Sequence, residues 1–122
     1  MTGPNTVQRL EIWQDGMKIV EGVYLASGDW PIDERFGLVS QVRRAAVSIP
    51  ANIAEGIGRE TPREIARSCR IPLGSAYEVH TLVSLFCRFR FCSESQVAGV
   101  FEDLNVLTHH ISQFIKYQES KG

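Results

Sequence analysis

Residues 34–57 read ERFGLVSQVRRAAVSIPANIAEGI, and this stretch decides the fold class. Its apolar residues recur every three or four positions, which is the spacing of one face of an α-helix. The stripe consists of Val39, Val42, Ala46, Ile49 and Ile53. Asp33 is expected to cap this helix at its start, and Gly56 and Gly58 to end it. Pro50 lies in the middle and removes one backbone donor, so we expect a kink there.

Three further stretches have the same periodicity and predict helices over about residues 9–27, 62–90 and 94–119. The stripe of the first is Leu10, Trp13, Met17, Val20 and Tyr24. The last two each begin with a capping box, Thr61-Pro62-Arg63-Glu64 and Ser93-Glu94-Ser95-Gln96. Pro72 is expected to bend the helix over residues 62–90 or to break it.

The links between these helices are short, so consecutive helices should be antiparallel neighbours. We therefore predict a single domain of residues 1–122, all-α, folded as an up-down-up-down antiparallel four-helix bundle. The residues expected to be buried in its core are Trp13, Val42, Ile49, Ile53, Val79, Val83, Leu104 and Ile111.

Composition excludes several classes of protein. The 122 residues have a net charge of −1, which argues against a strongly basic nucleic-acid-binding arm and against an acidic tail. No apolar run is long enough to span a membrane, and the first ten residues lack the apolar core of a signal peptide. Three cysteines, an odd number, suit free thiols in a reducing cytoplasm.

The sequence contains no recognisable catalytic or metal-binding motif. The Glu-x-x-His pattern of metal-binding bundles is absent at all three histidines. His109 and His110 are adjacent, so on a helix they diverge by about 100° and should both face solvent. His80 is expected to be packed or hydrogen-bonded rather than a ligand. We therefore predict no enzyme activity, no metal and no cofactor.

A polar ridge follows the helix over residues 34–57, on the side opposite its apolar stripe. Its members are Gln41, Arg44, Ser48, Asn52, Glu55 and Arg59. A second strip lies beside it, is mostly small and apolar, and should be exposed to solvent in an isolated monomer. It consists of Arg43, Val47, Pro50 and Ala54. One interpretation is a solvated face with an apolar flank. The other is a contact between subunits that includes Gln41, Arg43, Arg44, Val47, Ser48, Pro50, Asn52 and Glu55.

Charge is segregated along the chain. Residues 35–92 have a net charge of +5, against −4 for residues 1–34 and −2 for residues 93–122. Every basic residue of the middle block is an arginine, which suits bidentate contacts to phosphate or carboxylate. Four arginines lie close together in the sequence and are the candidates for nucleic-acid contacts: Arg59, Arg63, Arg67 and Arg70. The alternative is an ordinary exposed charged face.

The run from Arg43 to Gly56, RRAAVSIPANIAEG, closely resembles a motif of the 23S rRNA-intervening-sequence proteins. Further matching positions extend the resemblance over about residues 10–118: Trp13, Phe36-Gly37-Leu38, Gln41, Arg59, Gly74-Ser75 and Glu78. The resemblance implies a compact four-helix bundle and a ring-like homopentamer, without an established enzymatic activity. A related branch, the accessory variability proteins of diversity-generating retroelements, binds nucleic acid through a basic surface. This chain differs from the family at Pro72, where alanine is usual, and from that branch in not being markedly basic.

These observations favour a cytoplasmic, non-enzymatic oligomeric bundle. We expect it to bind structured RNA or DNA, or a protein partner that handles nucleic acid, with the four arginines contacting the phosphate backbone. The alternative is a protein–protein scaffold that binds no nucleic acid, in which these arginines pair with acids of the first and last helices.

Overall fold

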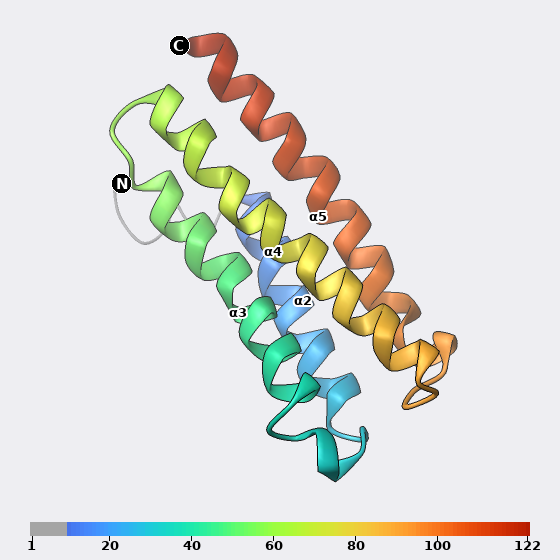
Figure 1. Cartoon of the computed structure of the whole chain (residues 1–122). Helices are drawn as coiled ribbons and strands as arrows, with labels where there is room; N and C mark the ends of the chain where they lie inside the picture. The colour runs from blue at the N-terminus through green and yellow to red at the C-terminus, as the bar shows by residue number, and fades with distance from the viewer. Residues whose placement is uncertain (1–9) are drawn as a thin grey trace.

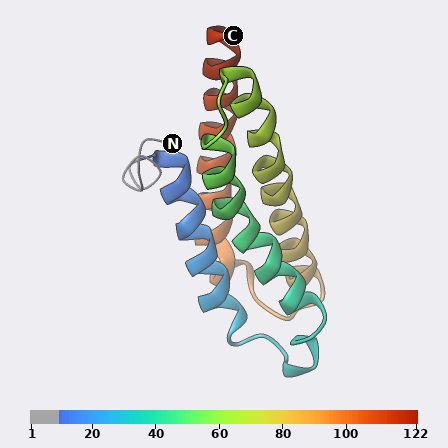
Figure 2. The same ribbon diagram turned by 90° about the vertical axis from the view of Figure 1, so that its left-hand side faces the viewer.

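The computed structural model describes residues 10–122 and contains four long helices in that range (Figure 1). They are α2 (Glu11–Ser27), α3 (Leu38–Ile57), α4 (Pro62–Arg88) and α5 (Glu94–Lys121), with a short 3-10 helix, η1, at Ile32–Glu34. α3 packs against α2 and α4, and α5 packs against the other sides of α2 and α4 (Figures 1 and 2). The predicted all-α, up-down-up-down four-helix bundle is confirmed, and the described residues contain no strand.

α3 has the predicted buried stripe, and all five of its members lie in the core. Its start differs from the prediction, because α3 begins at Leu38 and not at Glu34. Asp33 lies in η1 and Gly37 precedes the helix, so the prediction that Asp33 caps α3 is wrong. A carboxylate oxygen of Glu34 lies 3.5 Å from the backbone nitrogen of Leu38 and takes the place of that cap.

α2 begins at Glu11 in the described residues, and the predicted start near residue 9 lies outside them. Its predicted core stripe is wrong at Met17 and Tyr24, whereas Leu10, Trp13 and Val20 pack against the core from partly buried positions. The residues that face the core are Ile12, Gly16, Ile19, Val23 and Ser27. Met17 and Tyr24 are 36% and 45% exposed, and Trp13 is only partly buried. The cause is a glycine, because a Cβ at Gly16 would lie 3.3 Å from the backbone nitrogen of Pro50. α2 therefore turns the side that carries Gly16 and Ile19 inward, and Met17 and Tyr24 lie outward.

α4 and α5 begin at the predicted capping residues. The Thr61 hydroxyl accepts a hydrogen bond from the Glu64 N–H at 3.1 Å. At α5, the Ser93 hydroxyl accepts from the Gln96 N–H at 3.3 Å, and the Gln96 side chain accepts from the Ser93 N–H at 2.8 Å. Both satisfy N–H groups that a helix start leaves unpaired.

Both internal prolines are buried within continuous helices. α3 continues past Pro50 to Ile57, and α4 continues past Pro72 to Arg88. The break considered at Pro72 therefore does not occur. A proline removes one backbone hydrogen bond, and the apolar stripe that α4 buries on both sides of Pro72 holds the helix together across it.

The core runs along the inside of all four helices. Of the eight residues predicted to be buried, every one except Trp13 is fully buried. Trp30, in the link between α2 and η1, closes one end of the core by stacking on Phe86 of α4, with ring centroids 3.8 Å apart. Phe89 follows the end of α4 at Arg88 and is 54% exposed.

Candidate nucleic-acid and subunit-contact surfaces

The four candidate arginines lie at one end of the bundle, where α3 leads into α4. Arg59 lies in the link after α3, and all four are exposed. Arg63, Arg67 and Arg70 line an open pocket of about 590 Å³ between the start of α4 and the end of α5. Ala66, Glu119 and Gly122 complete its lining. Three of the four candidate arginines therefore share one pocket with residues from the end of the chain, and Arg59 does not line it.

Two of these arginines already have acidic partners. Arg59 pairs with Glu55, four residues earlier, at 2.5 Å, and Arg70 pairs with Glu119 at 2.9 Å. Arg63 and Arg67 form no ion pair within residues 10–122. Because all of these side chains are at least half exposed where they pair, the pairs add little stability. The unpaired positive charge in the pocket therefore comes from Arg63 and Arg67.

The polar ridge of α3 bonds mainly to its own helix. The Ser48 hydroxyl donates to the Ala45 carbonyl at 2.7 Å, and the Asn52 amide donates to the Ser48 carbonyl at 2.7 Å. Arg44 reaches only the Ser40 hydroxyl, at 3.4 Å. Gln41, Arg44 and Glu55 are exposed, whereas Ser48 and Asn52 are half-buried. Within the single chain, Ser48 and Asn52 thus have hydrogen-bond partners on their own helix. The charged side chains of Arg44 and Glu55 remain exposed to solvent.

The strip beside the ridge is less exposed than predicted. Pro50 is buried against Gly16 of α2, so the prediction that it is exposed to solvent in an isolated monomer is wrong. Arg43 is half-buried, donates from Nε to the Ser27 hydroxyl at 2.8 Å, and lies over the ring of Tyr24 at 4.5 Å. Val47 remains 43% exposed. Of this strip, Val47 is the apolar side chain most available to a neighbour.

Sequence reasoning missed an exposed apolar surface across α2 and the start of α3. Tyr24, Phe36 and Val47 surround a hollow of about 440 Å³ that is also lined by Arg35, Val39, Ser40, Arg43 and Arg44. Phe36 is 89% exposed, and Met17 also faces outward from α2. Contiguous exposed aromatic and aliphatic groups beside arginines are typical of protein interfaces. The signal was present as the apolar stripe of α2, which was assigned to the core.

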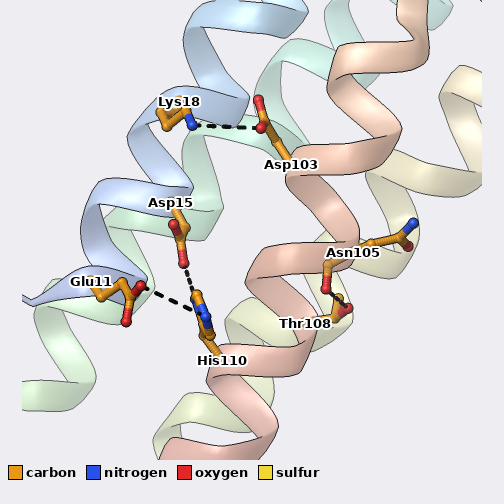
Figure 3. A network of polar contacts seen from close by, with 7 residues as sticks. All are labelled: Glu11, Asp15, Lys18, Asp103, Asn105, Thr108 and His110. Carbon is orange, nitrogen blue, oxygen red and sulfur yellow. Dashed lines mark hydrogen bonds and ion pairs between the residues drawn. The ribbon is translucent and has the colours of Figure 1, made fainter.

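α2 and α5 are joined by acid–base contacts along their shared edge (Figure 3). His110 Nδ1 lies 2.7 Å from an Asp15 carboxylate oxygen, and its Nε2 lies 3.7 Å from Glu11. The pKa of His110 is raised, first by the hydrogen bond to Asp15 and then by the two negative charges, against the opposing effect of burial. Lys18 and Asp103 make a second contact at 3.7 Å. The prediction that His110 faces solvent is therefore wrong.

The other two histidines, His80 and His109, lie on the surface of the bundle. His80 is exposed, with its ring 4.9 Å from that of Phe101, and His109 is also exposed. Across residues 10–122, no three His, Cys, Asp or Glu side chains are grouped as a metal would require. In the same range, every helix is too short or too polar to cross a membrane.

The fold gathers the segregated charges on opposite sides. α3 and α4 pack together and have a combined net charge of +3, whereas α2 and α5 pack together and have a combined net charge of −4. The bundle therefore has a basic side and an acidic side despite its net charge of −1.

Comparison with known families identifies a match over most of the chain. Residues 8–113 match the family model described as 23S rRNA-intervening sequence protein. The match covers most of the 122 residues and includes α2, α3, α4 and most of α5. No curated protein matches the chain.

Proposed function

We propose, from the premise that the chain belongs to the 23S rRNA-intervening sequence protein family, that it is a non-enzymatic nucleic-acid-binding module that works as a homo-oligomer in the cytoplasm. The ligand is a structured RNA or DNA, held by its phosphate backbone without reading of bases. The observation that carries the proposal is the pocket in which Arg63 and Arg67 lie unpaired beside Arg70.

The geometry of this pocket supports phosphate as the ligand. Arg63, Arg67 and Arg70 lie three or four residues apart and therefore on one face of α4. Guanidinium groups donate paired hydrogen bonds that match phosphate oxygens. Each phosphate that they neutralise releases counterions, so binding of this kind is strongly salt-dependent. A single pocket supplies few contacts, and several copies in one oligomer would raise the affinity by multivalency.

Two observations support the oligomer. The outward side of α2 and α3 exposes Met17, Tyr24, Phe36 and Val47, which a second copy would cover. The basic side formed by α3 and α4 is complementary to the acidic side formed by α2 and α5. Contact between two different faces of identical copies closes into a ring when the rotation between copies is suitable. The family resemblance makes five the expected number.

The test is fluorescence anisotropy with a labelled RNA hairpin and a labelled DNA duplex over a series of salt concentrations. Wild type should bind both probes weakly. The logarithm of its binding constant should fall linearly with the logarithm of the salt concentration. The double variant Arg63→Gln/Arg67→Gln should lower the salt slope by about two. The control Arg88→Gln/Arg90→Gln removes the same charge about 40 Å away, at the other end of α4, and should leave the slope unchanged.

The alternative is a protein scaffold that binds no nucleic acid. The pairing of Arg70 with Glu119 favours it, because it shows that acids of α5 can neutralise arginines of α4. A scaffold would show no binding to either probe at low salt and no retention on heparin. Equal loss of binding in both double variants would also exclude the pocket, since net charge alone would then explain the binding.

A further inference from the structure

Two cysteines meet where α4 ends and the chain turns into α5. Cys87 lies in the last turn of α4, and Cys92 lies two residues before the start of α5. Their sulfur atoms are 3.7 Å apart, which is direct contact, and both thiols are free. Cys69, the third cysteine, is buried elsewhere in α4.

The backbone holds the two sulfurs together. The Phe91 N–H donates to the Phe86 carbonyl at 2.9 Å, and the Arg90 N–H donates to the Cys87 carbonyl at 3.0 Å. These two bonds, with Arg90 at φ 62°, form a Schellman turn that reverses the chain at the end of α4. The turn returns Cys92 to the side of α4 that carries Cys87. The contact is therefore fixed by the fold of the turn and not only by side-chain rotation.

The two thiols differ in access. Cys92 is 8% exposed, whereas Cys87 is half-buried and lines an open groove of about 790 Å³ between α4 and α5. Burial, followed by the hydrogen bond and the charge of Cys87, raises the pKa of Cys92 to about 12. A reagent in the groove therefore meets Cys87 first, while Cys92 retains its proton.

We propose that Cys87 and Cys92 are a reversible dithiol site, which a small-molecule disulfide such as oxidised glutathione converts to an intramolecular disulfide. The Cys87 thiolate attacks one sulfur of the small disulfide, whose S–S bond breaks and releases one small thiolate. Cys92 then loses its proton to solvent and attacks the Cys87 sulfur, which releases the second small thiol. Two protein thiols are oxidised, and one small disulfide is reduced to two thiols.

The experiment equilibrates the native chain with glutathione redox buffers, quenches the exchange in acid and removes the glutathione by gel filtration. The remaining protein thiols are then counted with Ellman's reagent in denaturant at neutral pH. Trypsin cuts after Arg88 and Arg90, so a disulfide between the cysteines joins two peptides in the mass spectrum. We expect the thiol count to fall from three to one, with the joined peptides containing Cys87 and Cys92. Cys69→Ser is the control and should form the same bond.

The same equilibrium measured in concentrated urea separates a site built by the fold from two cysteines that are merely close in sequence. If the fold positions the sulfurs, their effective concentration should be at least about tenfold higher in the native chain, and the disulfide should raise the melting temperature. A native value equal to or below that in urea would overturn the proposal.

The order of attack is tested with single variants. Cys92→Ser should accumulate glutathione on Cys87, because the second step is then blocked. Cys87→Ser should acquire none on Cys92 while folded. Modification of Cys92 in that folded variant, at the rate seen for Cys87, would contradict the assigned order.

Discussion

Gly16 of α2 packs directly against Pro50 of α3, and a Cβ atom at Gly16 would lie 3.3 Å from the Pro50 nitrogen and 3.4 Å from its Cα. The same Cβ would lie 3.1 Å from Cγ2 of Ile49. Two of these three neighbours are backbone atoms, so they can move only if the helices separate. The contact therefore sets both the spacing of α2 and α3 and the rotation of α2.

Gly16→Val should destabilise the bundle despite the better helix propensity of valine. The added atoms overlap Pro50 and Ile49, and overpacking of this kind typically costs about 1–3 kcal/mol. Chemical denaturation measures the change. Gly99→Val is the matched control, because nothing lies within 4 Å of a Cβ at Gly99, and it should leave stability unchanged or slightly raised. Equal effects of the two substitutions would show that the close approach does not constrain the packing.

The fold could be predicted because helical stripes and capping boxes are local signals. Thr61 and Ser93 accept the backbone bonds that their positions implied, and the stripe of α3 is buried throughout. The rotation of α2 was missed because Gly16 has no hydrophobic side chain to mark it as a core residue. Ile12, Ile19 and Val23 share the inner face of α2 with Gly16, and the close approach at Gly16 leaves Met17 and Tyr24 exposed.

Of the candidate surfaces, the sequence could predict only the parts that lie on a single helix. Arg63 and Arg67 share a face of α4 through their spacing alone. The partner of Arg70 is Glu119, 49 positions later, and the partner of His110 is Asp15, 95 positions earlier. Pairings over such separations depend on which helices become neighbours and at what register, which no single-helix pattern specifies.

The contact between Asp15 and His110 should make stability depend on pH. The pKa of His110 is raised above its ordinary value of 6.5 in the folded chain, so the folded state binds the proton more tightly than the unfolded state. The contribution is fully present below about pH 6.5 and is lost as pH rises through the folded pKa. In Asp15→Asn, this loss of stability as the pH rises above about 6.5 should largely disappear.

Thermal unfolding of wild type, Asp15→Asn and His109→Gln over that range checks this prediction. His109 is exposed on the same helix, so His109→Gln should keep the wild-type pH profile. Parallel profiles for wild type and Asp15→Asn would mean that another group produces the pH dependence.

Arg90→Gly should stabilise the turn between α4 and α5. Arg90 has φ 62°, a left-handed conformation that costs a residue with a Cβ about 1–2 kcal/mol and glycine almost nothing. Glycine also adds entropy to the unfolded chain, so the net gain should be up to about 1 kcal/mol. A rise in melting temperature of about 3–5 °C corresponds to that gain. Arg88→Gly, in the last residue of α4, should lower the melting temperature instead.

The ion pair of Glu55 with Arg59 discriminates between an exposed ridge and a subunit contact. In the single chain, the Glu55 and Arg59 side chains are 61% and 50% exposed. Such an i,i+4 pair contributes only about 0.3–0.5 kcal/mol. If a neighbouring copy covers the ridge, removal of Glu55 leaves Arg59 buried and unpaired near Arg44 and Asn52, which typically costs about 3–5 kcal/mol.

We predict the larger effect for Glu55→Ala, with partial loss of the oligomer, because the ridge combines charged groups with the half-buried Ser48 and Asn52. Sedimentation velocity and thermal unfolding of the same samples measure both consequences. Glu119→Ala is the matched control, since it breaks an equally exposed pair with Arg70 outside the ridge. It should shift the melting temperature by less than about 2 °C and leave the assembly unchanged. If Glu55→Ala behaved like this control, the ridge would be a solvated face, and the subunit contact would have to involve other residues, such as Tyr24 and Phe36.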